Sequence, residues 1–166
     1  MKIYNNVLTD ETIQKLWAET NQTKGEDVWR ISTLSWIQDI QRGILASAGC
    51  KVVSPEIAES IESQVKHLLP PYEKLYQQIY VWPRGSGISA HNDGDKKFGA
   101  TIYLNNHWEL DFGGLFVWQD KESEELKVRM PEFNSMVVND TEELHLVTPV
   151  AFNCYAIRHT VQIWGV

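Results

Sequence analysis

The feature of the sequence that most restricts its fold is a change of residue pattern near Tyr72. After this point, short runs rich in aromatic and β-branched residues alternate with turn-forming residues, which is typical of a β-sandwich or barrel. The acidic run from Asp120 to Glu125 is expected to be a solvated hairpin tip. About eight strands are predicted, at Leu75–Trp82, around Ile88–Asp93, and at Phe98–Asn105, Leu115–Trp118, Leu126–Met130, Ser135–Asn139, His145–Val147 and Ala156–Trp164.

The residues before Tyr72 are expected to be mainly helical. Thr9 is a candidate N-cap for a helix with an apolar face formed by Ile13, Leu16 and Trp17. A weaker helix is predicted over about residues 35–48. Ser54-Pro55 opens another helix, which Pro70-Pro71 ends. The pattern predicts an α+β chain of one domain, residues 1–166, with helical support over about 1–72 and a barrel over about 73–166.

The composition narrows the classes of function. A formal net charge of −7, from 22 acidic and 15 basic residues, disfavours a nucleic-acid partner, because binding to a phosphate backbone relies on clustered Lys and Arg. Two cysteines are too few for a disulfide framework and form no CxxC pair. The first residues lack the apolar core of a signal peptide, and no run approaches the ~18 apolar residues of a membrane span. We therefore expect a cytoplasmic protein with no membrane partner.

Three residues are candidate metal ligands. In an extended segment His91 and Asp93 project to the same side, and His145 is the best candidate for a distant third ligand. Two histidines and one carboxylate form the facial triad of non-heme Fe(II) oxygenases. The structural alternatives are a surface turn pair for the first two and a buried, hydrogen-bonded histidine for the third. A second pair, His107-x-Glu109, is set aside because a strand connection is expected there.

Short motifs then follow one another over about half of the chain. They are Gly85-x-Gly87, His91-x-Asp93, Tyr103-Leu104-Asn105, Gly113-Gly114-x-Phe116, His145-x-Val147-x-Pro149, and Arg158 with Trp164 six residues later. This series resembles the Fe(II)/2-oxoglutarate-dependent dioxygenases, and most closely their prolyl hydroxylase-like branch. The resemblance implies a double-stranded β-helix, a jelly-roll or cupin-like barrel, with N-terminal supporting helices. It also implies that His91, Asp93 and His145 bind Fe(II).

The same resemblance assigns residues to the cosubstrate, 2-oxoglutarate. Arg158 is expected to bind its far carboxylate, because a guanidinium matches a carboxylate through two parallel hydrogen bonds. Tyr103 is expected to contact that carboxylate, and Thr160 to add a hydroxyl donor. In close relatives the basic residue follows the distal histidine by fewer residues, and ungapped counting places Cys154 there. The retained spacing from Arg158 to Trp164 indicates a lengthened loop at Val150–Asn153 instead.

The activity implied is hydroxylation of an unactivated C–H bond with Fe(II), 2-oxoglutarate and O2, releasing succinate and CO2. The resemblance favours a prolyl residue of a peptide or protein. One alternative keeps this chemistry but acts on a free amino acid or small metabolite. The others are a non-catalytic cupin-like barrel that binds metal or ligand, and a zinc hydrolase. Arg158 and Tyr103 favour the oxygenase hypotheses, since a hydrolase needs no dicarboxylate anchor. The sequence predicts no oligomeric state.

Overall fold

A computed structural model describes residues 1–21, 29–31, 48–94, 96–140 and 143–166. These residues form two α-helices, α1 (Asp10–Thr20) and α3 (Pro55–Val65), and the short 3-10 helices η2 (Lys66–Leu68) and η3 (Leu110–Phe112). They also form eleven strands: β1 (Lys2–Asn5), β2 (Arg30–Ile31), β3 (Gly49–Val52), β4 (Leu75–Trp82), β5 (Ile88–His91), β6 (Phe98–Tyr103), β7 (Phe116–Gln119), β8 (Leu126–Arg129), β9 (Ser135–Asp140), β10 (His145–Val147) and β11 (Arg158–Gly165). None of the described helices is long and apolar enough to cross a membrane.

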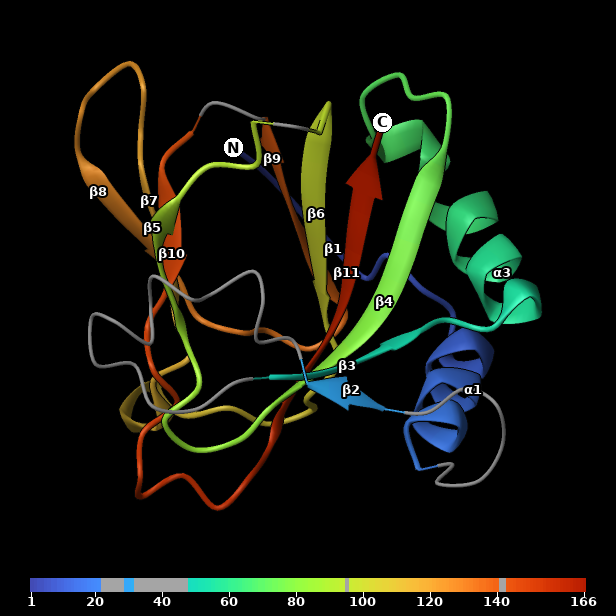
Figure 1. The fold of residues 1–166 in the computed structure, drawn as a ribbon, viewed down its shortest axis with the longest axis horizontal. Coiled ribbons are helices and arrows are strands. Elements are labelled where there is room, and N and C mark those ends of the chain that lie inside the picture. Colours follow the sequence, from blue (N-terminus) through green and yellow to red (C-terminus); the bar gives the residue numbers. More distant parts are fainter. Residues whose placement is uncertain (22–28, 32–47, 95, 141–142) are drawn as a thin grey trace.

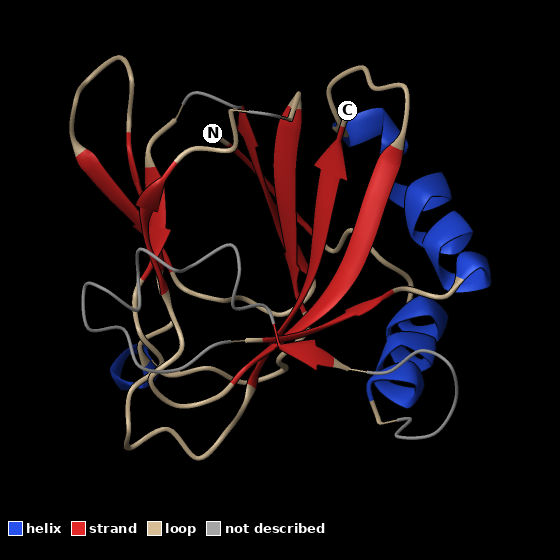
Figure 2. Cartoon of the chain, in the orientation of Figure 1, coloured by secondary structure: helices blue, strands red, loops and turns tan. Residues whose placement is uncertain are grey.

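The strands form two antiparallel sheets that face each other. The larger has the order β1-β9-β6-β11-β4-β3-β2, and the smaller has the order β5-β10-β7-β8. Figures 1 and 2 show the larger sheet in the middle, with α1 and α3 on one side and the smaller sheet on the other. This arrangement confirms the predicted α+β double-stranded β-helix, with its helices on one outer face.

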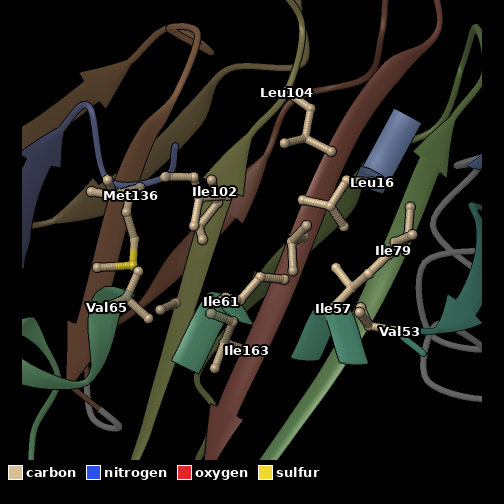
Figure 3. Close-up of a cluster of buried hydrophobic side chains, with 14 of the residues drawn as sticks. Leu16, Val53, Ile57, Ile61, Val65, Ile79, Ile102, Leu104, Met136 and Ile163 are labelled. Atoms are coloured by element: carbon tan, nitrogen blue, oxygen red, sulfur yellow. The ribbon is translucent and has the colours of Figure 1, made fainter. Parts of the chain in front are cut away.

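Alternation along the strands of the larger sheet separates two layers of side chains. On β6, Phe98, Ala100 and Ile102 belong to the core beneath the helices, because successive strand residues point to opposite faces. Leu16 of α1 and Ile61 of α3 pack into this outer core and are fully buried (Figure 3). The helices therefore stabilise the larger sheet from the face that the smaller sheet does not cover.

The layer between the two sheets is aromatic. Tyr103, on β6, lies in a buried cluster that joins the inner faces of both sheets. The larger sheet also contributes Tyr80 and Trp82 from β4, and the smaller sheet contributes Phe116 and Trp118 from β7. Among the described residues, this inner layer is the hydrophobic cluster that contains side chains of both sheets. A site between the sheets would therefore lie next to it.

Several sequence predictions are confirmed, and one is incomplete. Helix α1 begins after Thr9, whose hydroxyl accepts a hydrogen bond from the Thr12 amide, and β4 and β10 have the predicted bounds. The first 72 residues contain the expected helices α1 and α3, but β1, β2 and β3, which were not predicted from the sequence, also lie there and extend the larger sheet. These strands have only two to four residues each, too few to show a period, and they depend on pairing with distant strands. The helix predicted at 35–48 falls, except for Ala48, outside the described residues.

A buried carboxylate joins the two helices to the sheet. Glu19, near the end of α1, accepts hydrogen bonds from the backbone N–H and the hydroxyl of Ser54, the N-cap of α3, at 2.9 and 2.8 Å. Its carboxylate also lies 3.8 Å from the ammonium of Lys51 on β3. Glu19 and Lys51 are only 4% and 5% exposed, so each charge depends on the other for compensation.

We expect Glu19→Ala to lower the free energy of unfolding by about 3–5 kcal/mol, because it leaves a buried ammonium unpaired. Chemical denaturation would measure this loss. Glu11→Ala is the matched control: Glu11 pairs with Lys15 on the exposed face of the same helix, where a salt bridge contributes about 0–1 kcal/mol. Equal losses in the two variants would contradict the structural role of Glu19.

Candidate active site

Strand pairing brings the three predicted metal ligands together. His91, at the end of β5, lies opposite His145, at the start of β10, and the centroids of their rings are 4.4 Å apart. Asp93 lies just beyond β5, with its carboxylate oxygens 3.9 Å from Nε2 of His91 and 3.7 Å from Nε2 of His145. One potential ligand atom from each residue falls within 4.8 Å of the others. This group has the composition of a facial triad.

Backbone hydrogen bonds orient both imidazoles. Nδ1 of His91 lies 2.7 Å from the carbonyl oxygen of Ser89, and Nδ1 of His145 lies 2.9 Å from that of Glu143. A carbonyl can only accept, so Nδ1 donates and Nε2 of each neutral ring keeps its lone pair for a metal. The ring of Phe116 stacks on His145 with centroids 5.3 Å apart and restricts its rotation.

The electrostatics of His145 also suit a ligand. Burial lowers its pKa below the ordinary 6.5, and the neighbouring His91 acts in the same direction. The Glu143 carbonyl and the Asp93 carboxylate oppose this shift. Because burial has the largest effect, the ring is neutral near pH 7, as a metal ligand must be.

Asp93 is held from the larger sheet. The side-chain amide of Asn139 on β9 donates a hydrogen bond of 2.9 Å to Oδ2 of Asp93. Gly99 of β6 lies directly behind: a Cβ atom there would stand 2.6 Å from the same oxygen and 2.8 Å from Oδ1 of Asn139. Close packing against Gly99 and a hydrogen bond from Asn139 therefore fix the carboxylate. Sequence reasoning missed the role of Gly99.

Arg158 is an unusual buried cation. It is the first residue of β11, and its side chain is 1% exposed. None of its three guanidinium nitrogens has a hydrogen-bond partner among the described residues, and neither has the hydroxyl of the fully buried Tyr103. The guanidinium carbon lies 5.0 Å from the ring centroid of Trp82 and 5.3 Å from that of Tyr103. Burial lowers the pKa of Arg158 and raises the pKa of Tyr103, and each residue partly offsets the shift of the other.

Two further residues shape the surroundings of Arg158. Trp82 donates from Nε1 to the hydroxyl of Thr160 at 3.1 Å, which leaves the Thr160 O–H able to donate to a ligand. Gly114 has a φ of +61°, and a Cβ atom there would lie 2.8 Å from Cδ of Arg158. Glycine is required both for this backbone conformation and for the close approach of the arginine.

The residues before β11 form an irregular connection. Residues 151–157 form no strand, so β11 begins at Arg158. Cys154 is buried within this connection, where its thiol donates to the carbonyl of Ala156 at 3.1 Å.

The second His-x-acid pair of the sequence lies apart from the candidate ligands. His107 and Glu109 form an exposed ion pair at 3.1 Å.

A comparison of the sequence with models of protein families identifies the family of this chain. Residues 77–165, more than half of the chain, match the model of the 2OG-Fe(II) oxygenase superfamily, where 2OG is 2-oxoglutarate. The chain belongs to that superfamily. As a 2OG-Fe(II) oxygenase it uses Fe(II), 2-oxoglutarate and O2. A comparison with curated proteins found no match.

Solved structures share the fold of this oxygenase. A Pseudomonas putida prolyl-4-hydroxylase superposes with a TM-score of 0.73 at 17% identity, covering 99% of this chain and 91% of its own. A Trichoplax adhaerens prolyl hydroxylase, solved with a hypoxia inducible factor peptide fragment, gives 0.68 at 16% identity and covers 99% and 82%. The viral collagen prolyl hydroxylase of Paramecium Bursaria Chlorella virus-1, in a 2OG complex, gives 0.64 at 15% identity and covers 98% and 93%. At these identities the likeness establishes the fold.

We expect the metal-free oxygenase to lose stability as the pH falls below about 6.5. The unfolded chain takes up a proton at His145 near its ordinary pKa of 6.5, whereas the folded chain, with a lowered pKa, resists protonation until a lower pH. The free energy of unfolding then falls by up to about 1.4 kcal/mol per pH unit for this residue. Denaturation at several pH values in the presence of a chelator would measure the slope.

His145→Asn should make this pH dependence shallower. Part of it should remain, because burial lowers the pKa of His159 as well. The wild-type protein, measured in the same chelator, is the reference for the slope. An unchanged slope in His145→Asn would contradict the assignment.

Proposed function

We propose that this oxygenase hydroxylates an unactivated C–H bond, with release of succinate and CO2, and that its substrate is a prolyl residue in a peptide or protein. His91, Asp93 and His145 would hold Fe(II). Arg158, Tyr103 and Thr160 would hold 2-oxoglutarate. When bound together, iron, 2-oxoglutarate and O2 supply the oxidising chemistry.

The observation that supports this proposal best is the guanidinium of Arg158, which is buried and has no hydrogen-bond partner among the described residues. A buried charge without a partner is strongly unfavourable, so its presence points to a ligand of opposite charge. The phenol of Tyr103 and the hydroxyl of Thr160 lie on the same inner face, and both can donate to the same anion. Three converging donors, one of them a planar fork, suit a carboxylate. A zinc hydrolase or a structural metal site would leave this group of donors unexplained.

Other residues of the chain hold the candidate ligands in position and keep water away from Arg158. The hydrogen bonds to Ser89 and Glu143 hold the two imidazoles in position, and Asn139 holds Asp93. The aromatic layer around Arg158 excludes water, which strengthens the attraction between guanidinium and carboxylate. Because the ligands lie on or beside paired strands, the site is largely formed before any metal or cosubstrate binds.

The inner face of the larger sheet supports a prolyl substrate. Tyr76 is 46% exposed, and Trp164, directly opposite it on β11, is half-buried and packs edge-on against Tyr80. Aromatic surfaces of this kind suit the flat, apolar ring of proline, and proline-rich peptides dock in aromatic-lined grooves elsewhere. The prolyl hydroxylases with the same fold are consistent with such a substrate. A free amino acid or small metabolite is the alternative substrate class.

Wild-type protein loaded with Fe(II) is expected to convert 2-oxoglutarate slowly to succinate even without a second substrate. Arg158→Gln should weaken 2-oxoglutarate binding by about 100-fold or more, because it removes one partner of a buried charge pair. His145→Ala should abolish turnover. Succinate formation measured against 2-oxoglutarate concentration would test both. Lys97→Gln removes an exposed cation that pairs with Glu73 and should behave as wild type; activity retained in Arg158→Gln would refute the cosubstrate assignment.

Proline-containing peptides are expected to gain the mass of one oxygen atom in the presence of enzyme, Fe(II), 2-oxoglutarate and O2. The matched control is the same peptide with alanine in place of each proline, which should stay unmodified. Mass spectrometry of a peptide library would locate the added oxygen. Oxygen transfer to free amino acids or small metabolites, with none to any peptide, would establish the alternative substrate class.

A further inference from the structure

The side-chain amide of Gln162, on the inner face of the larger sheet, uses its oxygen in a hydrogen bond but not its nitrogen. The residue lies in the middle of β11 and is half-buried. The hydroxyl of the buried Thr101, opposite on β6, donates a 2.7 Å hydrogen bond to its Oε1. In this orientation none of the described residues accepts a hydrogen bond from its Nε2. Thr101 therefore fixes the side chain while both amide N–H donors stay available to a ligand.

Strand register places Gln162 between the metal ligands and Arg158. Residues that pair directly across neighbouring strands form one level of the sheet. On one side of Gln162 is the level of Trp164 and Gly99, and Gly99 lies against the Asp93 carboxylate. On the other side is the level of Thr160 and Tyr103. Successive levels on one face of a sheet are about 6.7 Å apart. Gln162 is thus one level from each half of the proposed site.

The length of 2-oxoglutarate fits this spacing. The guanidinium of Arg158 extends along the inner face as far as Tyr103, whose ring centroid is 5.3 Å away. The two carboxyl carbons of an extended five-carbon diacid are about 5 Å apart, from four C–C bonds. A molecule held by Arg158 at one carboxylate therefore brings its other carboxylate to the level of Gln162, beside the metal ligands.

From this placement we infer that Gln162 is a cosubstrate-binding residue, whose Nε2 donates a hydrogen bond to the carboxylate of 2-oxoglutarate at the metal end. The inference rests on the function proposed above. It extends the set of donors from the far carboxylate to both ends of the cosubstrate. A neutral amide suits this position, because a carboxylate side chain would repel the anion and a cation would compete with the metal for it.

The test is the affinity of 2-oxoglutarate for protein loaded with Mn(II) in place of Fe(II), measured by calorimetry without O2. Gln162→Leu should weaken binding by about tenfold or more, because a hydrogen bond to a charged group is lost. Gln162→Glu should weaken it further through repulsion. The matched control is Gln78→Leu: Gln78 lies on the same level one strand farther from the metal ligands and should keep wild-type affinity.

Two additional measurements separate a binding role from a structural one. The affinity of each variant for Mn(II) alone should equal that of the wild type, since the Gln162 side chain bonds to Thr101 and to none of the three ligand residues. Thr101→Val, which keeps the amide but removes its anchor, should weaken 2-oxoglutarate binding less than Gln162→Leu. If Gln162→Leu does not fold, the two other single variants decide the question. Wild-type affinity for 2-oxoglutarate in both Thr101→Val and Gln162→Glu would overturn the inference.

The outcome for Arg158 shows which proposal has failed. If wild-type protein binds 2-oxoglutarate and Arg158→Gln does not, but Gln162→Leu binds within twofold of the wild type, only the inference about Gln162 is wrong. If Arg158→Gln binds as tightly as the wild type, the proposed cosubstrate site itself is wrong.

Discussion

The antiparallel pairing of β5 with β10 is the interaction on which the candidate active site depends. It sets His91 opposite His145 although more than fifty residues separate them in the chain. Both strands belong to the smaller sheet, whereas the groups that support and complete the site, Asn139 and Arg158, belong to the larger one. The distance between the two sheets therefore controls how the ligands meet their supports. The aromatic layer between the sheets maintains that distance.

The protein separates stability from chemistry on the two faces of one sheet. The outer face, beneath α1 and α3, is mainly aliphatic and well packed (Figure 3). The inner face carries groups that weaken a protein unless a ligand satisfies them, above all the guanidinium of Arg158 and the hydroxyl of Tyr103. The outer core offsets this cost, and binding of an anion would remove it. Such a division explains why the supporting helices are needed although they contribute nothing to the site.

Local pattern was enough to predict most of the barrel and to place His91 and Asp93 on one side of the candidate metal site. β4 is eight residues of aromatic and β-branched character and was located within its observed bounds. The His91-x-Asp93 spacing works because two residues on an extended segment share a face. Short strands such as β3 were missed because their pairing with distant residues, not their composition, makes them strands. Asn139 is 46 residues from Asp93, and no local signal could have joined them.

The alternation along β6 has a consequence for how this chain can change in evolution. Phe98, Ala100 and Ile102 belong to the outer core, while Gly99 and Tyr103 belong to the candidate site. An inserted or deleted residue within β6 would exchange the two sets at once, because every side chain beyond it would move to the opposite face. The turn between β7 and β8 serves neither the core nor the site, since Glu122, Glu124 and Glu125 are exposed there. Changes of length should therefore accumulate in that hairpin among homologues, while β6 keeps its length.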